Sequence, residues 1–456
     1  MSIKVPKHYY NNDPTSFAFK TCQERWPVIV QNAVDDVTSE LNKFNSKEAK
    51  EQGKIIVAQL KDLKQKLIND AKIEPFNEPN VPSLNSYDET LQKLPESEIT
   101  WLTGPWLYLE CYLYRLINLF FLKQSHWSDF DVFENLKRET FKSSTFGIYE
   151  LAIQYREFKK QLDARKPNLD SLELLFREFV DICLWGNATD LSLLANATLE
   201  DIKSVQGAEL RKKSEKNILA NDLDQAWQQL LSIQKNDQKR VDFVLDNAGF
   251  ENYTDLILSL FLLDTGMVNT VVFHCKTRPW MVSDTMIKDV HLLLSDLQNL
   301  EWFPEHRIDL DFLVSEISTH LKNGKIILKE SEFWTLDLDY WNISPLETKY
   351  GGNLIHKELL HSDLVIIKGD LNYRKLTGDR QWDRSTPFTV AIDGLNKSGL
   401  KLFALRTCKA DVCCGLPKGK NEELCEYWRS LGNEVGELWC SSGKWAVISY
   451  SDGNGA

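Results

Sequence analysis

The sequence predicts an α/β protein in which a helical N-terminal region packs on a region built around a mostly parallel sheet. Two observations indicate this class. Residues 1–235 show mainly helical periodicity, whereas from residue 236 onward short β-branched apolar runs alternate with longer amphipathic segments. Such alternation is typical of βαβ units and parallel strands. We therefore expect a mostly helical region over residues 1–235 and an α/β catalytic region over residues 236–456.

The first half contains five helix candidates. The segment 48–69 repeats Lys, Glu, Leu and Ile at helical spacing, and prolines at positions 75, 79, 82 and 95 then break the pattern. The next candidate, 101–122, is rich in aromatic residues, and Pro105 suits its first turn. The remaining candidates are 144–159, 171–185 and 221–234.

The second half contains six strand candidates, at residues 240–245, 269–274, 325–328, 364–368, 400–405 and 445–449. Helix candidates lie between several of them, at residues 253–263, 285–297 and 310–322. In an open α/β sheet, ligands bind beyond the carboxyl ends of the strands. The residues that follow each strand are therefore the place to look for a site.

Composition limits the class of protein. The chain has 456 residues, 43% of them apolar, and a formal net charge of −12. This charge disfavours nucleic acid and membrane surfaces as partners, and no basic run is longer than Arg211-Lys212-Lys213. The N-terminus lacks a secretory apolar segment, no apolar stretch is long enough for a membrane span, and the nine cysteines form no Cys-x-x-Cys pair. We expect an intracellular, cytoplasmic protein, with a nuclear pool left open, and no obligate protein partner.

Polar residues that suit a metal ion follow the first two predicted strands. Asp246 and Asn247 come directly after the first strand, and Asp284 lies at the start of the helix after the second. Two carboxylates and an amide offer hard oxygen ligands, which favour Mg²⁺ or Mn²⁺ and also permit Co²⁺ or Ni²⁺. Such an ion would polarise a phosphoryl group and activate water. A single strand-end aspartate is more often a turn or cap residue, so the prediction depends on all the clusters together.

Basic residues that suit a phosphate group follow two later strands. They are Lys368, Arg374, Arg406 and Lys409. Arginine forms paired hydrogen bonds with phosphate, and lysine supplies a mobile charge. Asp370 is a candidate general acid or base, or the group that orients Arg374. Asn372 and Tyr373 are candidates for hydrogen bonds to sugar hydroxyls.

Three motifs carry a family resemblance. They are Leu245-Asp246-Asn247-Ala248-Gly249, Lys276-x-x-Pro279-Trp280-Met281-Val282-Ser283-Asp284 and Lys368-Gly369-Asp370-Leu371-Asn372-Tyr373-Arg374-Lys375-Leu376. With these motifs, and over most of its length, the chain resembles the metal-dependent damage-control phosphatases. The run Arg406-Thr407-Cys408-Lys409 resembles the Arg-Thr-x-Lys signature of one subfamily. That subfamily acts on sugar phosphates and includes proteins also described as acidic-residue, or protein-glutamate, methyltransferases. The chain looks like a fungal member of it.

The resemblance implies a helical N-terminal part packed on a three-layer, Rossmann-like α/β/α part. It implies one divalent ion, Mn²⁺, Co²⁺, Ni²⁺ or Mg²⁺, on Asp246, Asn247 and Asp284. It also implies catalysis by Asp246, Asp370 and Lys409. The substrate-binding residues that it implies are Asp246, Asn247, Asp370, Leu371, Asn372, Tyr373, Arg374 and Lys409. The expected reaction is hydrolysis of small sugar phosphates, such as fructose 1-phosphate and fructose 6-phosphate, in metabolite damage control.

The residues leave three alternatives open. Asp246 rather than water could attack phosphorus, although Asn247-Ala248 replaces the Asp-x-Asp of phosphatases that use this route. A protein-glutamate methyltransferase that uses S-adenosylmethionine is the second, although only one glycine, Gly249, follows the first strand. A non-enzymatic binding protein is the third. Glu110, Asn187 and Asp190 are weaker candidates to line a cleft between the two regions.

Overall fold

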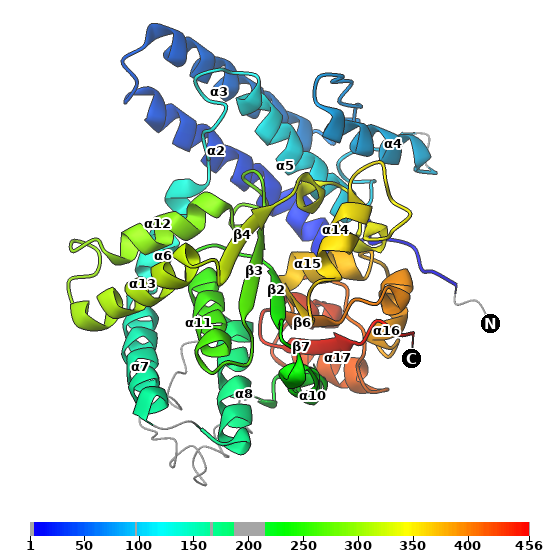
Figure 1. Cartoon of the computed structure of the whole chain (residues 1–456). Coiled ribbons are helices and arrows are strands. Elements are labelled where there is room, and N and C mark those ends of the chain that lie inside the picture. Colours follow the sequence, from blue (N-terminus) through cyan, green and yellow to red (C-terminus); the bar gives the residue numbers. More distant parts are fainter. Residues whose placement is uncertain (1–3, 96–97, 165–166, 187–214, 456) are drawn as a thin grey trace.

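A computed structural model describes residues 4–95, 98–164, 167–186 and 215–455 of the chain. The described residues form one seven-stranded sheet with the order β1-β7-β6-β5-β2-β3-β4 (Figure 1). Neighbouring strands run parallel except β6 and β7. The strands are β1 (Ile218–Asn221), β2 (Arg240–Val244), β3 (Thr270–Cys275), β4 (Ile326–Glu330), β5 (Leu364–Lys368), β6 (Leu402–Thr407) and β7 (Ala446–Ser451). The mostly parallel sheet is therefore confirmed.

The six predicted strands are present, and β1 is the strand that the sequence pattern missed. β1 is four residues long, lies at the edge of the sheet beside β7, and has half-buried to exposed side chains. The prediction instead began a helix at Asn221, which is wrong by two residues because Asn221 ends β1. A short edge strand with no buried alternation gives little periodicity to read.

The order of the strands reverses between β2 and β5, which pair with each other. From β2 the chain continues outward to β3 and β4, and from β5 it continues the other way to β6 and β7. In doubly wound sheets, ligands bind at the carboxyl ends beside such a reversal. The ends of β2 and β5 are thus the expected place for a site.

Alternate residues of the central strands enter two different hydrophobic clusters. In β5, Leu364 and Ile366 belong to one cluster, and Val365 and Ile367 belong to the other. Both faces of the sheet are therefore covered, which gives the three layers expected for a parallel sheet. Each cluster draws side chains from both sides of residue 235, and the division of the chain there stays a prediction.

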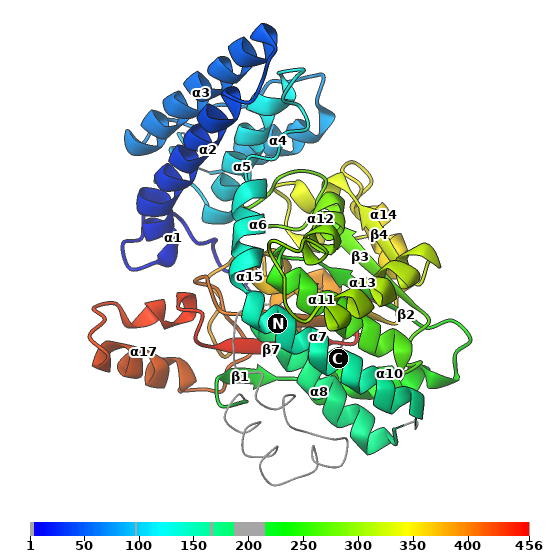
Figure 2. The same ribbon diagram turned by 90° about the vertical axis from the view of Figure 1, so that its left-hand side faces the viewer.

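The helices of the first half fall into two groups in space. Figures 1 and 2 show α2, α3 and α5 together at one end of the molecule, whereas α7 and α8 lie beside α13 and α11. The described helices that precede β1 are α1 (Phe17–Lys20), α2 (Trp26–Leu41), α3 (Lys47–Ile68), α4 (Asn85–Lys93), α5 (Trp106–Leu122), α6 (Glu134–Ser143), α7 (Thr145–Ala164) and α8 (Leu169–Trp185). The helix predicted over 48–69 is confirmed as α3, whereas α2 was missed.

The helix predicted over residues 101–122 begins later than expected. Pro105 is the residue before α5, with an extended ψ of 130°, and not part of its first turn. A residue that precedes proline is disfavoured in helical conformation, so the chain before Pro105 forms turns and α5 starts at Trp106.

The helices that follow β1 in the chain flank the sheet. They are α10 (Leu223–Ser232), α11 (Phe250–Asp264), α12 (Ile287–Leu297), α13 (Arg307–Lys322), α14 (Gly352–Leu359), α15 (Gly369–Leu376), α16 (Phe388–Ala391) and α17 (Lys420–Ser430). α15 follows β5 without any intervening loop, so the motif that starts at Gly369 is helical. Among the described helices, none is both long and apolar enough to cross a bilayer.

Candidate metal and phosphate site

The loops that follow β2 and β3 are joined to each other. The Thr285 amide donates to the Asp246 carbonyl at 2.8 Å, and Asn247 and Asp284 form an isolated antiparallel bridge. The three predicted metal ligands are therefore brought together beyond the carboxyl ends of two neighbouring strands.

The two aspartates lie in a buried environment rich in carboxylates. Asp246 is 6% exposed and Asp284 is 2% exposed. Burial, followed by the charges of Glu251 and Asp284, raises the pKa of Asp246 well above its ordinary value. Burial also raises the pKa of Asp284 to about 6, against the opposing charge of Lys276. A bound cation would offset the cost of holding these carboxylates together.

Lys276, directly after β3, is the buried cation of this cluster. Its Nζ donates to the Leu245 carbonyl at 2.7 Å and lies 3.1 Å from Asp284 Oδ2. Apart from this ion pair, Asp284 Oδ2 has no hydrogen-bond partner among the described residues. A buried carboxylate oxygen in this state is suited to bind a cation.

The turn from β5 into α15 approaches the same aspartate from the neighbouring strand. Gly369 has a φ of +81°, and a Cβ atom at this position would lie 1.9 Å from Asp246 Oδ2. Only glycine permits this approach of backbone to carboxylate. The buried carboxylates and the amide together offer hard oxygen ligands that fit a divalent ion such as Mg²⁺ or Mn²⁺.

The side-chain amide of Asn247 is held at both ends. Its Nδ2 donates to Asp246 Oδ2 at 2.9 Å and to Glu251 Oε2 at 2.8 Å. Its Oδ1 accepts from the Ser283 hydroxyl at 2.5 Å. The amide therefore has a defined orientation, with its nitrogen toward the carboxylates.

Asp370 connects the ends of β5 and β6. Its Oδ1 accepts hydrogen bonds from Arg406 Nε at 2.8 Å and from the backbone amide of Lys409 at 2.9 Å. The alternative that Asp370 orients Arg374 is wrong, because the partners of Arg374 are two other carboxylates. Asp370 holds in place the loop that carries Lys409.

Arg374 connects α15 to the N-terminal helices. Its guanidinium donates to Glu110 Oε2 at 2.5 Å and to Asp379 at 3.2 Å, and it lies 3.6 Å from the centroid of the Trp106 ring. The half-buried Glu110 thus has a cation as its partner, as a carboxylate in this environment requires. Contact between Arg374 and a substrate stays a prediction.

Of the four predicted phosphate-binding cations, Lys409 is the exposed one. Arg406 is fully buried and donates to the Val412 carbonyl at 2.6 Å, and Lys368 is fully enclosed as well. The Lys409 side chain is exposed. The pKa of Asp246 is raised by burial and lowered by the charges of Lys276 and Lys409. Lys409 is therefore placed to attract an anion toward the predicted metal ligands.

The remaining predicted substrate-binding residues are buried within the fold. Leu371 is 7% exposed and belongs to a hydrophobic cluster. Asn372 Nδ2 donates to the Lys368 carbonyl at 2.7 Å, and its Oδ1 accepts from Tyr340 at 2.5 Å. The Tyr373 hydroxyl lies 3.1 Å from the Cys414 sulfur. Substrate contact by these three residues stays a prediction.

Sequence reasoning placed Lys276 and Gly369 in motifs without giving either a function, and it gave no role to Glu251. Lys276 and Gly369 stand two and one residues beyond predicted strands, and Glu251 stands four residues after the predicted ligand Asn247. A lysine just beyond a buried strand and a glycine between a strand and a polar motif were available signals. Asn187 and Asp190, proposed as cleft residues, lie outside the described residues, as does the basic run at 211–213.

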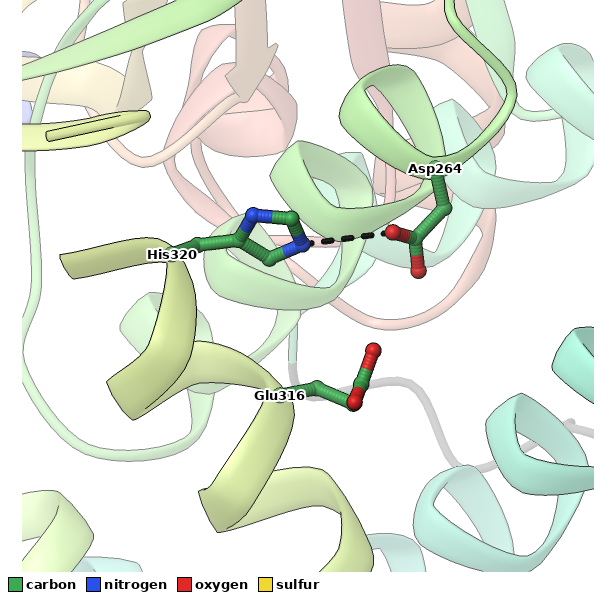
Figure 3. A group of neighbouring side chains, drawn as sticks. All are labelled: Asp264, Glu316 and His320. Atoms are coloured by element: carbon green, nitrogen blue, oxygen red, sulfur yellow. Dashed lines mark hydrogen bonds and ion pairs between the residues drawn. The ribbon is translucent and has the colours of Figure 1, made fainter. Parts of the chain in front are cut away.

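A second acidic group lies away from this site. Asp264, Glu316 and His320 place one ligand atom each within 4.8 Å of one another, and Figure 3 shows the three side chains pointing toward each other. Asp264 ends the 15-residue helix α11, which begins at the candidate site, so about 22 Å of helix separates them. Lys159 Nζ lies 3.1 Å from Asp264 Oδ1 and 3.8 Å from Glu316 Oε2. This ammonium already supplies the positive charge that a metal would bring.

Replacing Asp264 with asparagine is expected to lower the free energy of unfolding by about 2–4 kcal/mol at pH 7, because Lys159, His320 and Tyr155 lose their anionic partner. Burial raises the pKa of Asp264, but hydrogen bonds from His320 and Tyr155 and the Lys159 charge lower it below its ordinary value. The stabilisation is thus present above about pH 4 and is lost as the pH falls further. Urea unfolding at pH 7 and pH 3 measures both effects.

The control is Asp311→Asn, which alters an exposed pair with Arg307 on α13. An equal loss of stability in both variants would contradict the prediction.

Fold and site together define an α/β protein with a cluster of buried carboxylates at the carboxyl ends of a mostly parallel sheet. The profile of the damage-control phosphatase ARMT1-like domain matches residues 21–424. The chain belongs to this family.

Similar full-length proteins carry the same family description. Proteins called damage-control phosphatase ARMT1 are 32% identical in Bos taurus, over 96% of this chain and 97% of the relative, and 32% identical in Homo sapiens, over 98% of both. The Xenopus tropicalis protein of that name is 34% identical over 96% of both chains. A crystal structure of a DUF89 family protein from Pyrococcus horikoshii covers 94% of this chain and 96% of its own, with 14% identity and a TM-score of 0.36.

Proposed function

We propose that the chain is a metal-dependent phosphomonoester hydrolase that acts on small sugar phosphates, such as fructose 1-phosphate and fructose 6-phosphate, in metabolite damage control. Membership of the damage-control phosphatase family supports the reaction class. The chemistry of the site supports the metal dependence. The sugar specificity follows from the resemblance of the Arg-Thr-x-Lys run at 406–409.

The observation that carries the proposal is the meeting of three elements at one edge of the sheet. The loops after β2 and β3 bring Asp246, Asn247 and Asp284 together. The end of β5 packs Gly369 against Asp246, and Asp370 fixes the loop that presents the exposed Lys409. A cation site with an exposed lysine nearby is suited to a small phosphate ester.

The residues take distinct roles in this proposal. Asp246, Asn247 and Asp284 hold a divalent ion. When no ion is bound, the positive charge of Lys276 neutralises part of the negative charge of the carboxylates. The ion, when bound, supplies Lewis acidity that stabilises charge on the phosphoryl oxygens and activates water. Lys409 attracts and orients the phosphate, while Asp370 keeps the Lys409 loop in place and stays a candidate for proton transfer at the leaving group.

Phosphate release by metal-stripped protein tests the proposal. Fructose 1-phosphate, fructose 6-phosphate and an aryl phosphate would be supplied with Mn²⁺, Co²⁺, Ni²⁺, Mg²⁺ or no metal. We expect metal-restored hydrolysis that falls on the order of 10³-fold in Asp246→Asn and Asp284→Asn, since the Lewis acid contributes several kcal/mol to the barrier. Asp129→Asn changes an exposed aspartate and should keep full activity. If the folded protein hydrolyses none of these substrates with any of the metals, the proposal is wrong.

Two alternatives stay hypotheses alongside this one. Attack by Asp246 in place of water predicts an acid-stable phosphoryl adduct on Asp246 in quenched reactions. Methylation of protein glutamate predicts measurable binding of S-adenosylmethionine by calorimetry, and no binding at millimolar concentration would end that alternative.

A further inference from the structure

Glu251 connects the predicted ligand Asn247 to a buried lysine. It lies on the first turn of α11, and its Oε2 accepts from Asn247 Nδ2 at 2.8 Å. Its Oε1 lies 3.4 Å from Lys368 Nζ. The two oxygens of one carboxylate thus have different partners, the ligand amide on one side and a cation on the other.

Lys368 is itself held rigidly by two helices. Its Nζ lies 3.0 Å from Asp255 Oδ1 on α11 and donates to the Cys183 carbonyl on α8 at 2.5 Å. The Cys183 thiol donates to the same Asp255 oxygen at 2.8 Å. Because 1% of the Lys368 side chain is exposed and two helices hold it, Lys368 cannot shift when the more exposed Glu251 side chain moves. It therefore fixes the position of Glu251 and not the reverse.

The orientation of the Asn247 amide decides whether the residue can bind a cation. The amide oxygen is a metal ligand, whereas the amide nitrogen is a donor that repels a cation. The two ends are similar in size, so packing alone does not distinguish them. A carboxylate only accepts hydrogen bonds, and for this reason the carboxylates of Glu251 and Asp246 both require the nitrogen to face them. Glu251 is the one of these two that is not itself a predicted metal ligand.

We propose that Glu251 is a positioning residue of the metal site: it fixes the Asn247 amide so that Oδ1, which accepts one hydrogen bond from the Ser283 hydroxyl, offers its second lone pair to a cation, and Lys368 fixes Glu251. This inference rests on the proposed metal-dependent function. Groups that orient a metal ligand in this way commonly account for 10- to 100-fold in metal affinity. Glu251 differs from Asp246 and Asp284 in acting through Asn247.

A double-mutant cycle separates positioning from direct ligation. Calorimetric titration of metal-stripped protein with Mn²⁺ at pH 7 would compare Glu251→Gln in the unmodified chain and in an Asn247→Asp background. In the unmodified chain we expect affinity to fall about 10- to 100-fold, because glutamine accepts or donates and no longer selects the amide orientation. A carboxylate at position 247 offers oxygen at both ends. In that background, Glu251→Gln is therefore expected to leave Mn²⁺ affinity unchanged or to raise it by removing like-charge repulsion.

Each outcome of the cycle decides the matter. Equal weakening in both backgrounds would overturn the positioning role, because Glu251 would then act as a ligand or through its charge. The positioning role would also be overturned if Glu251→Gln left the Mn²⁺ affinity unchanged in the chain that keeps Asn247. Glu139→Gln, which changes an exposed glutamate on α6, should bind Mn²⁺ like the unmodified chain. Glu251→Asp, tested in both backgrounds, replaces Glu251→Gln if thermal unfolding in EDTA shows that variant to be unfolded.

Failure of the inference is distinguishable from failure of the proposed function. Mn²⁺ binding with no phosphate release would contradict the hydrolase and leave the positioning role intact. Hydrolysis and Mn²⁺ binding that are both insensitive to Glu251→Gln would contradict only the positioning role. An unmodified chain that binds no Mn²⁺ would overturn both.

Discussion

Gly369→Ala is expected to abolish divalent metal binding while leaving the chain folded. A Cβ atom at Gly369 would lie 1.9 Å from Asp246 Oδ2 and 2.2 Å from Asp246 Cγ. Either the β5–α15 turn or the Asp246 carboxylate must move by more than an ångström to relieve this overlap. A displacement of that size in a catalytic group lowers the reaction rate about 10²-fold or more. Calorimetric titration with Mn²⁺ and phosphate release from fructose 1-phosphate measure the loss.

The matched control for this prediction is Gly419→Ala. Gly419 has a φ of +83°, close to that of Gly369, but no atom lies within 4 Å of an added Cβ. Both variants share the strain of a left-handed alanine, about 1–2 kcal/mol, and only one of them disturbs Asp246. Equal metal affinity in the two variants would mean that the approach of Gly369 to Asp246 has no bearing on the site.

Lys276→Met is expected to destabilise the metal-free chain by about 3–5 kcal/mol and to make its stability strongly dependent on added Mn²⁺. Lys276 Nζ lies next to Asp284, and its removal leaves this buried carboxylate without its ion-pair partner. A divalent ion restores that charge, so the midpoint of urea unfolding should rise more on addition of Mn²⁺ than it does for the unmodified chain.

Lys375→Met provides the control for lost burial of a lysine. Lys375 is also fully buried, but its Nζ donates to the Leu336 and Leu338 carbonyls at 2.5 and 3.1 Å. This variant should lose stability without any additional response to Mn²⁺. If both variants respond to Mn²⁺ in the same way as the unmodified chain, the prediction that the ion replaces the charge of Lys276 is wrong.

The central strands were predictable from the sequence because their periodicity is unambiguous. β5 matches the predicted bounds, and all five of its residues are buried. β1 and α15 were not predictable in the same way. β1 depends on pairing with β7 at the sheet edge, and α15 begins at Gly369, where a turn into helix looks like a polar loop.

The candidate site was predictable as a set of residues and not as a set of contacts. The rule that ligands bind beyond strand ends identified Asp246, Asn247 and Asp284, and the structure brings these residues together. The rule could not assign partners to the cations. Lys368 and Arg374 look like phosphate ligands in sequence, yet their carboxylate partners Asp255 and Glu110 are supplied by α11 and α5, distant in the chain. Such pairing is fixed by tertiary packing, which residue order does not reveal.

The reversal of strand order between β2 and β5 has a kinetic consequence. Asp246 follows β2, whereas Gly369, which packs against Asp246, follows β5. The site is therefore complete only after two segments far apart in the chain have paired. Pairing of distant segments is slow because loop closure must precede it. A cation that binds only the completed site stabilises the native state without assisting the earlier steps, and it therefore acts by slowing unfolding. The bound ion would then set the lifetime of the folded chain more than the speed at which it forms.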